Sequence, residues 1–115
     1  GVKVLLIKAG HKGAYLRTGN LAELNSSALR LSDRTGCPQG AWISPLAVDA
    51  GRFRNASGAG DCAVAGFLTS LLKDESIMTA GRFAMMAGRD NLYGNDALSG
   101  LVDWPRMELE VRSDW

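Results

Sequence analysis

Ser57-Gly58-Ala59-Gly60-Asp61 leads directly into a segment whose apolar residues repeat with helical spacing. Those residues are Ala63, Val64, Phe67, Leu68, Leu71 and Leu72. Positions three or four residues apart share one face of a helix, so the pattern predicts an amphipathic helix that ends at Lys73-Asp74-Glu75. A glycine-rich loop therefore enters a helix near Asp61, and the fold can be worked out from this junction.

The start of that helix has the features of an anion-binding site. A first helical turn leaves about four N–H groups without intrahelical partners, and the aligned peptide dipoles place partial positive charge there. Glycines let the backbone approach an anion closely, which suits a phosphate. An aspartate would repel a phosphate, but it can take a proton from an attacking hydroxyl. The alternative is that Asp61 is an ordinary first-turn acidic residue favoured by the dipole.

The first half of the chain is typical of strands. Residues 2–7 are almost continuously apolar, which predicts a strand buried on both faces of a parallel or mixed sheet. A turn over residues 10–13 and a second strand over 14–17 follow. Residues 18–40 are weakly patterned, and their apolar runs at 21–24 and 28–31 fit either a strand or a helical turn. Pro45 limits residues 41–48 to an edge strand at best.

The second half is typical of helices. Ser76 is a suitable N-cap for a second helix, whose small and apolar side is formed by Ile77, Ala80, Ala84 and Ala87. That helix should stop near residues 91–94. Helical fragments are expected over 95–101 and 104–110, the latter with Pro105 in its first turn. Strands followed by helices predict an α/β fold.

Composition excludes several classes of protein. The chain has 115 residues, is 46% apolar and 22% charged, and carries a formal net charge of +1. This charge lacks the basic excess of nucleic-acid-binding proteins. We find neither a membrane-spanning run nor a signal peptide. Cys37, Cys62 and a single histidine cannot complete a zinc site, so no metal site is expected within the chain. We expect a soluble, cytoplasmic protein that binds neither nucleic acid nor membrane.

Residues 55–68, which read Asn-Ala-Ser-Gly-Ala-Gly-Asp-Cys-Ala-Val-Ala-Gly-Phe-Leu, resemble the second signature of the ribokinase-like (PfkB) carbohydrate kinase family. That signature is an Asp-Thr-Thr-Gly-Ala-Gly-Asp run followed by small residues and Ala-Gly-Phe. Residues 4–15 are similar to the family's nucleotide strand and its Gly-x-x-Gly turn. The resemblance covers nearly the whole chain, and it implies the C-terminal portion of a ribokinase-like three-layer fold of sheet and helices.

The resemblance also implies roles for individual residues. Asp61 matches the catalytic base, and Gly58, Ala59 and Gly60 match the anion hole that stabilises the transferring phosphoryl group. A segment that lines the nucleotide is matched by Lys8, Gly10 and Gly13. A lysine at a strand end is otherwise commonly just solvated. The implied cofactors are ATP and Mg²⁺, with the Mg²⁺ ligands outside this chain.

Three departures from the family pattern affect these expectations. Asn55-Ala56-Ser57 replaces Asp-Thr-Thr near the family's monovalent-cation site; Asn55 and Ser57 keep oxygen ligands, but the change puts potassium activation in doubt. Met85 stands where many members have an asparagine near the adenine, so apolar contacts are expected there. Cys62 occupies the place of a small residue. Its position at a helix N-terminus predicts a lowered thiol pKa, although a small core residue is the alternative.

Family members are longer than this chain. They also contain an N-terminal region with sugar-binding residues, a β lid and an acidic motif that organises Mg²⁺. Residues 1–115 are therefore expected to be a single C-terminal nucleotide-binding part of a larger kinase domain, inactive by itself. Without sheet neighbours, residues 2–7 should favour association, which is compatible with a homo-oligomer.

The expected function is that of an ATP-dependent kinase acting on a hydroxyl of a sugar or related small molecule, with ATP and that substrate as partners. A nucleoside kinase of the same family and a non-catalytic nucleotide-binding or assembly fragment are alternatives. A KH-type RNA-binding loop would also contain Gly-x-x-Gly, but it joins two helices, whereas residues 10–13 lie between strand-like segments. An α/β domain with an accidental Gly-Ala-Gly-Asp is the remaining possibility.

Overall fold

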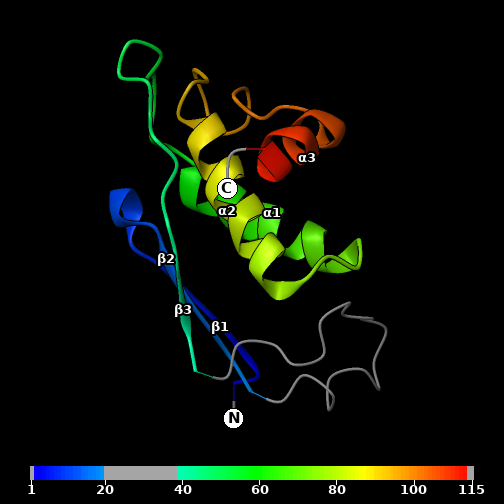
Figure 1. The fold of residues 1–115 in the computed structure, drawn as a ribbon. Helices are drawn as coiled ribbons and strands as arrows, with labels where there is room; N and C mark the ends of the chain where they lie inside the picture. The colour runs from blue at the N-terminus through cyan, green and yellow to red at the C-terminus, as the bar shows by residue number, and fades with distance from the viewer. Residues whose placement is uncertain (1, 20–38, 114–115) are drawn as a thin grey trace.

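The computed structural model describes residues 2–19 and 39–113 (Figure 1). Its elements, in chain order, are β1 (Val4–Lys8), the 3-10 turn η1 (Gly10–Lys12), β2 (Ala14–Thr18), β3 (Ala41–Ile43), α1 (Ala59–Leu72), α2 (Ile77–Asn91) and α3 (Trp104–Ser113). The strands form a small sheet, α1 and α2 pack against one of its faces, and α3 lies against α2. This arrangement confirms the predicted α/β class. Residues 21–24, residues 28–31 and Cys37 lie outside the described residues.

The sheet is antiparallel in the order β1-β2-β3. The prediction that residues 2–7 form a doubly buried strand of a parallel or mixed sheet is therefore wrong. β1 lies at one edge, and its side chains alternate between the helix side and an outer face, where Leu5 and Ile7 are 40% and 51% exposed. The apolar run arises because both faces of this strand are apolar, although only one face is covered within the described chain. β3 is the other edge and ends two residues before Pro45, as expected.

The turn between β1 and β2 depends on glycine. Gly13 has a φ of 98°, and a Cβ at this position would collide with the backbone oxygen of Ile43. A side chain would therefore be excluded both by backbone conformation and by the approach of β3. The indole N–H of Trp42 donates to the Lys12 oxygen at 2.8 Å, which ties β3 to η1. The turn is thus held at the end of the sheet.

Small residues bring α1 and α2 close together. A Cβ at Gly66 would lie 3.0 Å from both the Ala87 Cβ and the Phe83 oxygen. α2 begins at the predicted N-cap, because the Ser76 hydroxyl oxygen accepts from the Thr79 N–H at 3.1 Å. The core between helices and sheet is formed by Ala14, Leu16, Ile43, Ala63, Phe67, Leu71, Ile77, Ala80 and Ala84. This packing fixes the N-terminus of α1 relative to β1.

The segment before α3 differs from the prediction of a helix over residues 95–101. It consists of turns, in which the Asp96 carboxylate accepts from the N–H groups of Leu98 and Ser99 at 2.9 and 2.8 Å. Asp and Ser side chains that bond to nearby backbone groups compete with helix formation, which explains the outcome. α3 does form, and its Trp104 ring stacks on Phe83 with centroids 4.3 Å apart.

None of the helices in the described ranges is long and apolar enough to cross a membrane.

Candidate functional site

The loop before α1 requires glycine. Gly58 is the N-cap of α1 and has a φ of 80°. A Cβ there would lie 2.8 Å from the Cβ of Ala97 and 2.9 Å from its oxygen. The left-handed conformation and the close approach of residue 97 both favour glycine. The chain therefore makes a tight turn immediately before the helix starts.

That turn leaves two backbone amides without partners at the N-terminus of α1, which we call the α1 mouth. The Cys62 N–H donates to the Gly58 oxygen at 2.9 Å, and the Ala59 N–H donates to the Ala56 oxygen at 3.3 Å. The N–H groups of Gly60 and Asp61 donate to no other residue in the described ranges. Unpartnered amides at a helix N-terminus, together with the helix dipole, attract anions.

The Asp61 side chain is exposed next to these amides. It forms no salt bridge with another described residue. A carboxylate without a fixed cation can accept a hydrogen bond from an incoming hydroxyl, so its position is compatible with a general base. A permanent ion pair would have held it away from such a role.

A cavity of about 330 Å³ lies beside the α1 mouth. Residues that are far apart in the sequence line it together: Lys8, Gly10 and Gly13 from the β1–β2 region and Ala59 and Gly60 from α1. The structure thus brings together the residues expected to line a nucleotide with part of the expected anion hole. Gly58 and Asp61 do not line the cavity but adjoin the residues that do.

Lys8 connects the two parts of this site directly. Its ammonium group donates to the Gly60 oxygen at 3.0 Å, although the side chain is exposed. The cation therefore stands at the first turn of α1, close to the bared amides. An exposed ammonium can exchange a carbonyl for a phosphate oxygen at little cost, because both are oxygen acceptors and the phosphate carries charge.

The remainder of the cavity wall is largely apolar. It includes Pro45, Leu46 and Val48 from the segment after β3, and Met85 and Leu92 from the α2 region. Residue motifs pointed to Met85 but not to the other four. The sequence did contain one signal for them, namely the apolar run over residues 41–48 that Pro45 interrupts. Such a run is compatible with the lining of a cavity as well as with a strand. An apolar slot of this kind suits a flat aromatic group such as a nucleobase.

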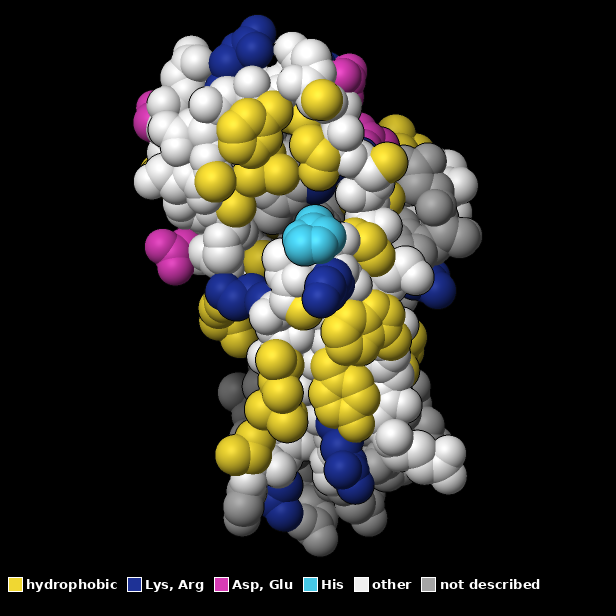
Figure 2. Space-filling model, turned by 90° about the vertical axis from the view of Figure 1, so that its left-hand side faces the viewer, with side chains coloured by type: hydrophobic (Ala, Val, Ile, Leu, Met, Phe, Trp, Pro, Cys, Tyr) yellow, Lys and Arg dark blue, Asp and Glu magenta, His cyan; other side chains and the backbone are white. Residues whose placement is uncertain are grey.

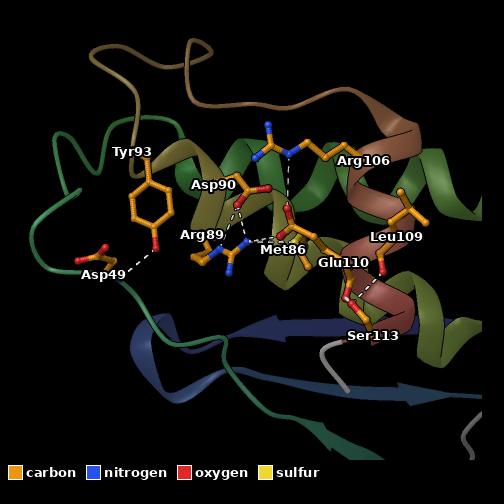
Figure 3. A network of polar contacts seen from close by, with 9 residues as sticks. All are labelled: Asp49, Met86, Arg89, Asp90, Tyr93, Arg106, Leu109, Glu110 and Ser113. Carbon is orange, nitrogen blue, oxygen red and sulfur yellow. Dashed lines mark hydrogen bonds and ion pairs between the residues drawn. The ribbon is translucent and has the colours of Figure 1, made fainter.

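Two basic side chains of the cavity were not identified from the sequence, namely His11 of η1 and Arg89 of α2. Figure 3 shows Arg89 reaching from α2 toward two carboxylates. Its Nη2 atom lies 2.7 Å from Asp90 Oδ1 and 2.9 Å from Glu110 Oε2 of α3. Arg106 lies 3.7 Å from the other oxygen of Glu110. The network attaches α3 to the end of α2 that lines the cavity.

Asp90 is the member of that network whose hydrogen-bonding groups are not all satisfied. Its Oδ2 atom is buried and has no hydrogen-bond partner in the described part of the chain. Burial raises the pKa of the Asp90 carboxyl, and the hydrogen bonds and charge of Arg89 offset this effect only in part. The neighbouring Tyr93 hydroxyl accepts from the Asp49 N–H at 2.9 Å, which attaches the segment after β3 to the end of α2 (Figure 3).

No family model matches the chain, and no curated protein matches it. Solved structures do match. A nucleoside kinase of the ribokinase family from Methanocaldococcus jannaschii has a TM-score of 0.73 and 17% identity over 96% of this chain and 30% of its own. A ribokinase from Thermotoga maritima has a TM-score of 0.71 and 18% identity over 98% and 31%.

This chain has a partial ribokinase-like fold. A third match is a fructokinase from Vibrio cholerae bound to fructose, ADP and calcium, with a TM-score of 0.65 and 20% identity over 92% of this chain and 30% of the fructokinase. A double mutant of that fructokinase is described with fructose, ADP and potassium. The chain spans about 30% of the length of these structures. These structural neighbours are kinases.

In this ribokinase-like fold, one of the two side chains considered for a monovalent cation, that of Asn55, already has structural contacts. The Asn55 Oδ1 atom accepts from the Ser57 N–H at 2.7 Å, and its Nδ2 group donates to the Asn95 oxygen at 3.3 Å. The Asn91 side chain donates to the backbone oxygen of Ser57 at 2.9 Å. A neutral amide engaged in this way is a weaker cation ligand than a carboxylate. Asn55 is therefore a poor ligand for potassium.

The prediction of a lowered thiol pKa at Cys62 is wrong. Cys62 is only 3% exposed, and its Sγ atom lies 3.4 Å from the Ala97 oxygen. Burial first, and then the nearby Asp61 charge, raise the pKa of this thiol. The alternative that Cys62 is a small core residue is correct. Desolvation raises the pKa of its thiol by more than the helix N-terminus lowers it.

The described residues contain no cluster of three histidine, cysteine or acidic side chains able to hold a metal ion. Within the ribokinase-like fold of this chain, Asp61 is the carboxylate at the α1 mouth. A single carboxylate does not make a Mg²⁺ site, so the expectation that its ligands lie outside the chain stays a prediction.

Proposed function

We propose that this chain forms the nucleotide-binding part of an ATP-dependent kinase that phosphorylates a hydroxyl of a sugar or related small molecule. One observation carries the proposal: a single cavity joins an apolar slot, the Lys8 ammonium and the α1 mouth, where Asp61 is exposed. These are the parts that phosphoryl transfer from a nucleotide needs, namely a slot for the base, donors for the phosphates and a base for the acceptor.

The nucleotide would lie with its base in the apolar slot and its phosphates toward α1. Met85, Leu46 and Val48 offer apolar surface to a purine. Lys8 also lines the cavity, and its ammonium group lies beside Gly60 at the first turn of α1. We expect the phosphates to lie near Lys8, because their burial against apolar side chains alone would carry a desolvation cost. The terminal phosphate would then face the N–H groups of Gly60 and Asp61.

Those amides supply the electrostatic part of the reaction. The transferring phosphoryl group carries its charge on peripheral oxygens, and fixed N–H donors stabilise that charge without reorganisation. Asp61 would accept the proton of the acceptor hydroxyl as its oxygen attacks the terminal phosphorus atom in line. The leaving group is ADP, and the products are ADP and a phosphate monoester.

A divalent cation would neutralise phosphate charge in such a reaction, and Mg²⁺ is the cation we expect. The alternative of a non-catalytic nucleotide-binding chain uses the same cavity but gives Asp61 no function. A nucleoside acceptor instead of a sugar would leave the roles of the described residues unchanged.

The first test is nucleotide binding by the 115-residue chain, measured by isothermal titration calorimetry with ADP. Lys8→Met should weaken ADP binding about tenfold, because it removes one charge-assisted contact to a phosphate. Lys12→Met is the matched control, because Lys12 is also exposed in the same turn region but does not line the cavity. Equal affinities for the two variants would contradict the assigned orientation.

The second test addresses catalysis. The complete protein is screened against sugars and nucleosides with ATP, and ADP release is measured. Turnover with at least one acceptor that disappears in Asp61→Asn supports the kinase. ADP binding without turnover on any acceptor would support the non-catalytic alternative instead.

A further inference from the structure

Arg89 is the least exposed of the three basic residues that line the cavity. Lys8 and His11 are exposed, and Figure 2 shows the single histidine on the molecular surface, whereas the side chain of Arg89 is only 17% exposed. Met85 and Leu92, four residues before and three residues after Arg89, also line the cavity. Residues at this spacing are neighbours on one side of a helix. The Arg89 side chain therefore lies beside the apolar residues against which the base is proposed to pack.

Two carboxylates hold one edge of the Arg89 guanidinium. The Nε atom donates to Asp90 Oδ1 at 3.0 Å, and the Nη2 atom donates to Asp90 Oδ1 at 2.7 Å and to Glu110 Oε2 at 2.9 Å. Nη2 also lies 3.2 Å from the Met86 sulfur. Charge-assisted bonds through two nitrogens restrict the position and the plane of a guanidinium. Arg89 is thus oriented by α2 and α3 before any ligand binds.

The other edge of the guanidinium is open. The Nη1 atom donates to no other residue of the described ranges, and Figure 3 shows a terminal nitrogen of Arg89 turned away from both carboxylates. Protein does not enclose Nη1, since Asp90 Oδ2 and Asn91 Oδ1 are the buried, unpartnered side-chain oxygen and nitrogen atoms among the described residues. Because Arg89 lines the cavity, its two Nη1–H groups are available to a ligand there.

The side chains of the cavity supply donors but no oxygen acceptors. Its described lining consists of the three basic residues, glycines, a proline and apolar residues, so none of them has a side-chain oxygen. The 6-amino group of adenine is a donor, and it cannot bond to a guanidinium. A 6-oxopurine, such as guanine or hypoxanthine, presents O6 and N7 side by side, and arginine recognises this pair of acceptors in guanine. The cavity is therefore better matched to a 6-oxopurine than to adenine.

We propose that Arg89 selects the base of the nucleotide by donating its Nη1–H groups to O6 and N7 of a 6-oxopurine. The proposal rests on the proposed function, because it concerns the base of the same nucleotide. Guanosine and inosine nucleotides then bind more tightly than adenosine nucleotides, and their triphosphates serve as phosphoryl donors alongside ATP. Arg89 contacts the base, whereas Asp90 and Glu110 are positioning residues that act through Arg89.

The first experiment compares nucleotides on the unchanged, complete protein by isothermal titration calorimetry at one pH and one Mg²⁺ concentration. IDP carries an oxo group at position 6 where ADP carries an amino group. We expect IDP and GDP to bind about tenfold more tightly than ADP, because Arg89 meets acceptors on these two bases. 7-Deaza-GDP lacks the N7 acceptor and should bind about threefold more weakly than GDP. This comparison does not depend on the folding of a variant.

The second experiment assigns the preference to Arg89. Arg89→Lys keeps a positive charge near Asp90 but has no second edge for the base, so IDP and ADP should bind within about twofold of each other. Arg106→Lys is the matched control and should keep the preference, because Arg106 lies 3.7 Å from Glu110 but does not line the cavity. Circular dichroism checks that both variants are folded.

Equal binding of IDP and ADP, tighter binding of ADP, or unchanged binding of 7-deaza-GDP would each overturn the inference. A preference for IDP that survives Arg89→Lys, or that Arg106→Lys also abolishes, would overturn it as well. In each of these cases nucleotides still bind, so the proposed kinase function stands. If the complete protein binds none of these nucleotides, the proposed nucleotide site itself fails and the inference fails with it.

Discussion

At the scale of single residues, Asp61 and Lys8 at the α1 mouth differ in how their side chains are held. The Asp61 carboxylate is exposed and unpaired within the described residues, whereas the Lys8 ammonium is held 3.0 Å from the Gly60 oxygen. In the proposed kinase, one group would be available to a hydroxyl and the other would lie near the phosphates. The two roles predict different kinetic consequences for their removal.

Asp61→Asn in the complete protein should lower kcat by about 10²–10⁴-fold, because the amide cannot accept the hydroxyl proton. The KM for ATP should stay within about twofold, since the carboxylate lies outside the cavity that would hold the nucleotide. Steady-state kinetics with saturating acceptor measures both values. A variant with wild-type kcat would refute the role of Asp61 as the base.

Gly58→Ala should destabilise the chain by roughly 1–3 kcal/mol, since a non-glycine residue with a φ near 80° is strained and its Cβ would meet Ala97. Urea unfolding monitored by circular dichroism gives the free energy of unfolding. Gly51→Ala is a suitable control, because the structure gives Gly51 no positive φ and its neighbourhood is exposed. Similar losses for the two variants would argue against strain at position 58.

At the scale of elements, the network of Arg89, Asp90 and Glu110 joins α3 to α2. The raised pKa of Asp90 means that the folded chain binds a proton more readily than the unfolded chain does. Stability contributed by this group is therefore present below the ordinary value of 3.8 and is lost as pH rises through the higher folded-state value.

Asp90→Asn removes this titration and tests its sign. As the pH is lowered from about 7 to about 4, the free energy of unfolding of the wild type should rise relative to that of the variant. Chemical denaturation of both proteins at each pH gives the four values. A wild type that loses stability relative to Asp90→Asn at the lower pH would show that the pair with Arg89 outweighs burial.

The elements also show what the sequence could and could not predict. The helices at α1, α2 and α3 were predictable because their apolar spacing and caps, such as Ser76, are local signals. The antiparallel pairing of β1 was not predictable. An apolar run indicates a strand with two apolar faces, but it does not show which neighbouring element covers each face. The site divides in the same way: the motifs identified Gly60 and Lys8, whereas Leu46 and Arg89 join the cavity only through packing distant in sequence.

At the scale of the whole molecule, a cavity built from β1, η1, α1 and α2 implies that nucleotide binding stabilises the entire fold. A ligand bound only by the folded state at about 100 times its Kd adds about 2.7 kcal/mol. For a chain of 115 residues this should raise Tm by roughly 10 °C. Differential scanning fluorimetry with increasing ADP measures the shift. A Tm that does not respond to ADP at any concentration would count against the nucleotide site.

Lys8 belongs to the outermost strand, yet its ammonium grips the first turn of α1. This contact joins the edge of the sheet to the proposed phosphate site, so a displacement of β1 should also move the Lys8 ammonium relative to the N–H groups of Gly60 and Asp61. In the proposed kinase, the position of this edge strand would therefore tune the affinity for the nucleotide.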